Sequence, residues 1–147
     1  MKVLVINGAN LNMLGVREPE IYGPTGLDRI ETELRRKASP LGIDLEFFQS
    51  NHEGALIDRV QAASTQGIDA IILNPGGYTH TSVSLRDALL AARIPFVEVH
   101  LSRPTAREPF RHVSLFSDIA AGTISGFGAL VYELALDAIR SLHGPAA

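Results

Sequence analysis

One short segment in the middle of the chain constrains the fold more than any other. The apolar run 71–73 stops abruptly at Asn74, and a Pro-Gly-Gly turn and a polar cluster follow before a helical pattern opens at Ser82. An apolar run without polar alternation is typical of a strand buried on both faces, as in a parallel sheet covered by helices. Ligands of such sheets bind at the carboxyl ends of the strands. Asn74, Thr79 and His80 are therefore the first candidates for a site.

Strand and helix patterns alternate along the whole chain. Strands are predicted over 2–6, 44–49, 71–73, 95–99 and 122–125, and helices over about 25–41, 51–67, 82–92 and 130–142. Each crossover between parallel strands needs a connection of helix length, so the alternation predicts an α/β fold. We expect a flavodoxin-like three-layer sandwich with a five-stranded parallel sheet. With no internal repeat or linker, residues 1–147 are predicted to form a single domain.

Capping residues mark the expected helix boundaries. Thr25, Asn51 and Ser82 stand where an N-cap is expected, because their side chains can accept a hydrogen bond from the first helical turn. Gly42 and Gly67 are expected to end the first two helices.

Composition excludes several classes of partner. Apolar residues make up 46% and charged residues 20% of the chain, as in a globular protein. The net charge of -3 provides no positive field that would attract nucleic acid or an acidic membrane. Cysteine is absent, which fits a reducing compartment. No apolar segment approaches the roughly 20 residues needed to cross a bilayer, and the apolar N-terminal run is too short for a signal peptide. We expect a soluble, cytoplasmic protein.

Two long polar loops separate the predicted elements. Residues 9–24 form a longer strand-to-helix connection than the usual length of about 2–6 residues, and they contain Arg17 and Tyr22 between glycines and prolines. Long loops in compact domains are commonly lids or binding loops, so 9–24 is predicted to be a lid. The second loop covers 100–117.

Polar side chains from both loops and three strand ends are expected to meet at one edge of the sheet. This set contains Asn7, Asn10, Arg17, Tyr22, Asn74, His80, His100, Ser102, Arg107 and Arg111. Such a mixture of amides, imidazoles, guanidiniums and hydroxyls suits a small, hydroxylated substrate with a carboxylate.

Other interpretations of the same residues stay open at this point. Each asparagine taken singly is more often a turn residue, and a tyrosine in a loop is more often a packing anchor. A flavodoxin-like module for flavin or nucleotide is one alternative, although the phosphate-binding glycine motifs are missing. A signalling receiver domain is another, but Asn74 stands where its phosphorylated aspartate would be. Metal-ligand motifs are absent, so no cofactor or metal is expected.

Seven motifs together carry a more specific signal. They are NGANLNMLG at 7–15, REPEIYG at 17–23, FQSNHEG at 48–54, NPGGYTHTS at 74–82, LRDA at 85–88, EVHLS at 98–102 and REPFRH at 107–112. In order and spacing, over nearly the whole chain, they resemble type II 3-dehydroquinate dehydratase.

The resemblance implies a cofactor-free lyase that reversibly dehydrates 3-dehydroquinate to 3-dehydroshikimate, by anti elimination through an enolate, in the shikimate pathway to aromatic amino acids. It also implies trimers that assemble into dodecamers. Tyr22 matches the base, Arg17 the residue that keeps it ionisable, His100 the general acid, Glu98 the residue that orients this acid, and Asn10 the holder of a water beside the enolate. The matching substrate-binding set is Asn74, His80, Leu101, Ser102 and Arg111, with Asp87 reaching the site of a neighbouring subunit.

The assigned residue types fit this chemistry. A free phenol has a pKa of about 10, so a tyrosine base working near neutral pH needs a cation that favours the phenolate, shielded from water by a closed lid. The chain departs from the family pattern at Ala9, Gly77, Arg103, Thr105 and Val131, none of which is an assigned catalytic position. Arg103 is expected to place an extra cation beside the site.

Overall fold

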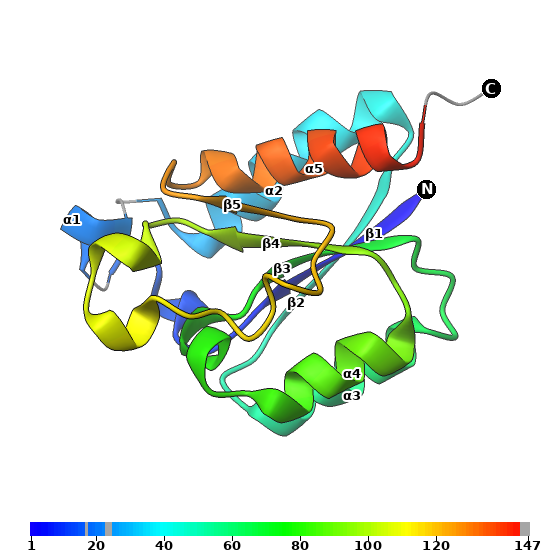
Figure 1. Ribbon diagram of the computed structural model, residues 1–147. Helices are drawn as coiled ribbons and strands as arrows, with labels where there is room; N and C mark the ends of the chain where they lie inside the picture. The colour runs from blue at the N-terminus through cyan, green and yellow to red at the C-terminus, as the bar shows by residue number, and fades with distance from the viewer. Residues whose placement is uncertain (17, 23–24, 145–147) are drawn as a thin grey trace.

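A five-stranded parallel sheet forms the centre of the molecule (Figure 1). The computed structural model describes residues 1–16, 18–22 and 25–144, with only the backbone of Pro19 and Tyr22. The strands are β1 (Lys2–Asn7), β2 (Asp44–Gln49), β3 (Ala70–Asn74), β4 (Phe96–His100) and β5 (Gly122–Ser125), in the spatial order β2-β1-β3-β4-β5. This order is that of a flavodoxin-like sheet. The predicted sheet is confirmed.

Helices cover both faces of the sheet, which makes three layers (Figure 1). The helices α2 (Leu27–Ala38) and α5 (Leu130–Leu142) lie on one face, and α3 (Glu53–Ala63) and α4 (Val83–Ala92) lie on the other. A further short helix, α1 (Pro19–Tyr22), lies in the predicted lid. None of the described helices is long and apolar enough to cross a membrane.

The side chains of each central strand divide between two separate cores. On β1, Val3 and Val5 pack against α2 and α5, whereas Leu4 and Ile6 pack against α3 and α4. Successive side chains of a strand point to opposite faces, so a strand covered on both faces needs an unbroken apolar sequence. Full burial of one such side chain stabilises the fold by about 1.5–3 kcal/mol. This requirement explains the apolar run at 71–73.

Only one of the three predicted N-caps is confirmed. The Ser82 hydroxyl accepts a hydrogen bond from the Leu85 amide at 3.0 Å, as a cap of α4 should. The prediction for Thr25 is wrong, because Gly26 occupies the N-cap of α2 and offers no side chain. Glycine is nearly as favourable at an N-cap as a residue with a capping side chain, because it adopts the extended backbone of that position at little cost.

The predicted cap Asn51 has a different role. His52 is the N-cap of α3, while the Asn51 carboxamide accepts a hydrogen bond from the backbone amide of Asn10 at 2.9 Å. The helix also ends earlier than predicted, at Ala63. Asn51 therefore ties the loop after β1 to the loop after β2.

Candidate active site

A cavity of about 180 Å³ opens at the carboxyl edge of the sheet. It is lined by residues that follow β1, β3 and β4, as the sequence predicts for ligand sites in such a sheet. The predicted site residues that line it are Asn10, Asn74, His80, His100, Leu101, Ser102, Arg107 and Arg111. The structure thus brings together eight predicted residues from segments far apart in the sequence.

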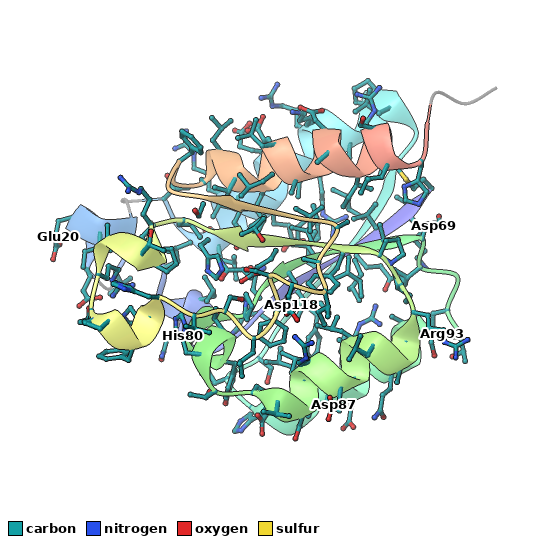
Figure 2. All side chains as sticks on the ribbon, viewed as in Figure 1. Glu20, Asp69, His80, Asp87, Arg93 and Asp118 are labelled. Atoms are coloured by element: carbon teal, nitrogen blue, oxygen red, sulfur yellow. The ribbon has the colours of Figure 1, made fainter. Side chains whose placement is uncertain are left out.

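The cavity lining leaves out four described residues that the sequence also offered as candidates, namely the buried Asn7, Thr79 and Glu98 and the exposed Asp87. Asp87 lies exposed on α4, away from the end of the sheet where His80 lies (Figure 2). Arg17 and the side chain of Tyr22 lie outside the described residues. The described backbone of α1 ends at Tyr22, so the predicted lid contains a helical turn.

Close backbone packing forms the floor of the site. The Gly8 amide donates a hydrogen bond to the Asn74 carbonyl at 2.8 Å, and a Cβ atom on Gly8 would lie only 2.2 Å from the Pro75 carbonyl oxygen. Gly76 has a φ of 62° and would bring a Cβ to 2.7 Å from the Ala9 carbonyl oxygen. Only glycine fits at these two positions, where the turns after β1 and β3 touch.

The buried Glu98 is paired with His100, which lines the cavity. They are two residues apart on β4, so their side chains leave the same face of the sheet. The His100 Nε2 lies 2.7 Å from Glu98 Oε1, and the Glu98 side chain is fully buried. An ionised carboxylate only accepts hydrogen bonds, so Nε2 is the donor. This leaves the Nδ1 of His100 for chemistry in the cavity that the residue lines.

Three hydroxyl groups also donate to the Glu98 carboxylate, and the longest of these bonds is that of Thr123 to Oε2 at 3.4 Å. Ser114 donates to Oε1 and Ser117 donates to Oε2, each at 2.6 Å. Burial acts to raise the pKa of Glu98, but the hydrogen bonds from His100, Ser114 and Ser117 and the charge of His100 outweigh it. The pKa of Glu98 therefore lies below its ordinary value, and this residue is a carboxylate at neutral pH.

Two further lining residues have fixed hydrogen-bonding roles. The Nδ1 of His80 donates to the Val113 carbonyl at 2.8 Å, since a carbonyl can only accept. Asn10 has a φ of 69°, a left-handed conformation that asparagine tolerates better than most residues. Its backbone is tied to Asn51, which fixes the start of the loop predicted to be a lid.

The two lining arginines supply positive charge at the rim. The Nε of Arg111 donates to Glu108 at 2.9 Å, and this bond lowers the pKa of the Glu108 carboxyl despite desolvation. Arg107 lies 3.9 Å from the same carboxylate. Arg103 is not among the lining residues of the cavity, because its side chain lies against Gly126, where a Cβ would come within 2.5 Å of its Cγ. Arg103 instead lines an adjoining hollow that shares Leu101, Ser102 and Arg107 with the cavity, so the extra cation lies beside the site and not within it.

Among residues 1–16, 18–22 and 25–144, no three histidine, cysteine, aspartate or glutamate side chains converge on a point where a metal ion could bind. The polar groups that line the cavity are mostly amides, imidazoles and guanidiniums. This donor set suits an anionic organic ligand better than a cation.

Comparisons with known proteins agree with this geometry. A family model for class II dehydroquinase matches residues 1–140. The chain belongs to the class II dehydroquinase family. The family predicted from the motifs is thus confirmed, and with it the assignment as a type II 3-dehydroquinate dehydratase.

Relatives and a solved structure match over nearly the whole chain. The chain is 58% identical over 142 residues to "3-dehydroquinate dehydratase 1" of Ralstonia nicotianae, covering 97% of this chain and 91% of the relative. It is 56% identical over 135 residues to "Catabolic 3-dehydroquinase 1" of Aspergillus terreus, covering 92% and 88%. A crystal structure of type II dehydroquinase from Butyrivibrio crossotus superposes with a TM-score of 0.92 at 44% identity, covering 95% of this chain and 97% of that one.

Sequence reasoning missed some members of the dehydroquinase site. Ser114 and Ser117 lie in a loop without periodic pattern, so nothing in the sequence links them to Glu98. A buried carboxylate does require hydrogen-bond donors, which could have prompted a search for hydroxyls in nearby loops. Asn7 lies at the predicted edge of the sheet, but it does not line the cavity, because its side chain is buried and accepts a 2.5 Å hydrogen bond from Tyr132.

Proposed function

We propose that this dehydroquinase removes water from 3-dehydroquinate by anti elimination through an enolate, within a single catalytic domain spanning residues 1–147. The hydrogen bond between the buried Glu98 and His100 at the cavity is the observation that supports it most directly. Such an elimination needs a base for the proton next to the ketone and an acid for the departing hydroxyl on the opposite face of the ring. An imidazole held in one orientation by a buried carboxylate is suited to the second task.

His100 is the proposed general acid. In its protonated form the imidazole carries hydrogen on both nitrogens, and Nε2 already donates to Glu98. The Nδ1 hydrogen then goes to the departing hydroxyl as the carbon–oxygen bond breaks, so that water leaves and His100 becomes neutral. Glu98 stabilises the charged form before the transfer and holds the ring in one orientation.

Tyr22 is the proposed base, and Arg17 the cation that keeps its phenol ionisable. Both lie in the segment 9–24, which we propose closes over the cavity as a lid and excludes water. The enolate that forms gains negative charge on oxygen, and Asn10 is proposed to hold a water beside it. Asn10 lines the cavity, which supports that role.

Neutral donors and one arginine are proposed to bind the substrate. The set is Asn74, His80, Leu101, Ser102 and Arg111, all of which line the cavity. We propose that Arg111 attracts the substrate carboxylate and that the amide and imidazole groups bind ring hydroxyls. No step of this mechanism uses a metal or cofactor.

We also propose that the enzyme assembles as trimers within a dodecamer, with Asp87 reaching into a neighbouring site. Val83, Asp87 and Leu90 are spaced by four and three residues, which places them along one stripe of α4. Val83 is 58% and Leu90 is 50% exposed, an apolar stripe that an interface would bury. The predicted cytoplasmic location stays a prediction.

The metabolic role is proposed to be biosynthetic, in the shikimate pathway to aromatic amino acids. The Aspergillus terreus relative bears the name of a catabolic enzyme, and both routes use the same reaction. Disrupting the gene in its host separates the two. A biosynthetic role predicts that growth then requires aromatic amino acids, while a catabolic role predicts instead that growth on quinate is lost.

Turnover of 3-dehydroquinate tests the proposed chemistry, followed through the ultraviolet absorbance of the conjugated enone product. We expect activity that persists in a metal chelator and falls by about 10²–10⁴-fold in Tyr22→Phe. Arg93→Gln, which changes an exposed residue at the far end of α4, is the matched control and should retain full activity. A folded wild-type protein without turnover would contradict the proposal, and bound flavin absorbance would then favour a binding module.

A further inference from the structure

A tyrosine of the last helix connects two strand ends beneath the cavity. Asn7 and Asn74 are register partners at the ends of β1 and β3, so their side chains leave the same face of the sheet. That face is covered by α5, and the Tyr132 side chain reaches both asparagines. All three side chains are buried, with Tyr132 fully enclosed.

The direction of each hydrogen bond in this trio is determined. The Tyr132 hydroxyl donates to Asn7 Oδ1 at 2.5 Å, and it accepts from Asn74 Nδ2 at 3.0 Å. Burial raises the pKa of the Tyr132 phenol, against a smaller opposing influence of the bond from Asn74, so the hydroxyl stays protonated and able to donate. Since its hydrogen is used on Asn7, its lone pair requires a donor, and the carboxamide nitrogen of Asn74 is that donor.

The other end of the Asn74 carboxamide is fixed as well. Its Oδ1 accepts a hydrogen bond from the Gly76 amide at 3.2 Å. The carboxamide is therefore held with its nitrogen toward Tyr132 and its oxygen toward the turn after β3. If the carboxamide were rotated by half a turn, its nitrogen would face the Gly76 amide, so that two donors would meet. Its oxygen would face the lone pair of the Tyr132 hydroxyl, so that two acceptors would meet, and neither contact is favourable.

We propose that Tyr132 is a positioning residue for substrate binding, because its hydroxyl fixes the orientation of the Asn74 carboxamide at the cavity. This inference rests on the proposed function, in which Asn74 contacts the substrate. Tyr132 itself does not line the cavity and touches no reacting atom. Its hydroxyl acts through Asn74, so its removal changes how well the substrate is held rather than how protons move.

Tyr132→Phe is the test, because it removes one oxygen and keeps the ring that fills the core. We expect KM for 3-dehydroquinate to rise on the order of tenfold, with kcat and its pH profile changed much less. Ile139→Val is the matched control. It removes one methylene from the same buried face of α5, about two turns further along, and should lower stability without raising KM.

A double-mutant cycle decides whether the effect passes through Asn74. In an Asn74→Ala background there is no carboxamide to fix, so adding Tyr132→Phe should raise KM by less than twofold. Equal KM increases in both backgrounds would overturn the inference, as would an unchanged KM in folded Tyr132→Phe. The proposed function fails in a different way, through absence of turnover in the wild type.

Discussion

Two buried polar clusters lie at the same edge of the sheet but on opposite faces. Glu98 and His100 face the α3 and α4 side, and Glu98 takes its remaining partners from the loop after β4 and from Thr123 on β5. Asn7 and Asn74 face the α2 and α5 side and share the hydroxyl of Tyr132. The first cluster contains a charge, and the second contains only neutral groups.

This difference indicates a division of tasks. A buried carboxylate with several donors can stabilise a protonated imidazole, so the charged cluster is suited to proton transfer. A neutral chain of hydrogen bonds has no proton to give at neutral pH, so it can only fix orientation. Changes to the first cluster should affect kcat and pH dependence, and changes to the second should affect KM.

The largest effect is expected from His100→Asn. Without an acid, the hydroxyl must leave without a proton, and kcat should fall by about 10²–10⁴-fold while KM changes little. Steady-state kinetics across pH 5–9 measures both constants. If kcat were unchanged in His100→Asn and KM rose instead, the proposed division of tasks would be wrong, because the charged cluster would then act in substrate binding. His112→Asn is the matched control, at an exposed residue outside the cavity lining.

Glu98→Gln should give an intermediate effect that depends on pH. The pKa of Glu98 is lowered in the folded protein, so the unfolded chain, with a value of about 4.3, binds the proton more readily. The stabilisation is complete above that value and is lost as the pH falls through the folded-state pKa. At pH 7 we expect the variant to be less stable by about 1–3 kcal/mol, and at about pH 3 the difference should shrink.

Urea unfolding of Glu98→Gln and the wild type at both pH values measures this. Asn7→Ala tests the neutral cluster in the same way and should show a stability loss that is equal at the two pH values. A pH-dependent loss in Asn7→Ala would mean that the two clusters do not differ in charge.

The smallest effect is expected from Ser114→Ala. Its hydroxyl donates to Glu98 and also accepts from the Phe116 amide at 3.0 Å, so the loop loses one anchor to β4. We expect a decrease of about 1 kcal/mol in the free energy of unfolding, with a modest fall in kcat. Ser141→Ala, at an exposed position of α5, should change stability by less than about 0.5 kcal/mol. Equal losses in both variants would show that the contact with Glu98 contributes nothing.

Much of the fold was predictable because it depends on local patterns. The unbroken apolar run before Asn74 predicted a central strand, and the predicted bounds of β2, β5 and α5 match the structure. The wrong caps at Thr25 and Asn51 have a common cause. Competing neighbours were equally compatible with the sequence, and tertiary contacts chose between them, as the bond from Asn10 to Asn51 illustrates.

The sequence by itself determined the layered α/β architecture, the family and the edge at which the site forms. Strand and helix periodicity, glycine turns and spaced motifs are local properties, and the alternation of strands and helices fixes the edge at which their ends meet. The tertiary structure alone decided which donors surround Glu98, that Arg103 lies against Gly126, and that Asn7 faces Tyr132. These contacts join residues up to 125 positions apart, and their geometry depends on how helices and loops pack on the sheet.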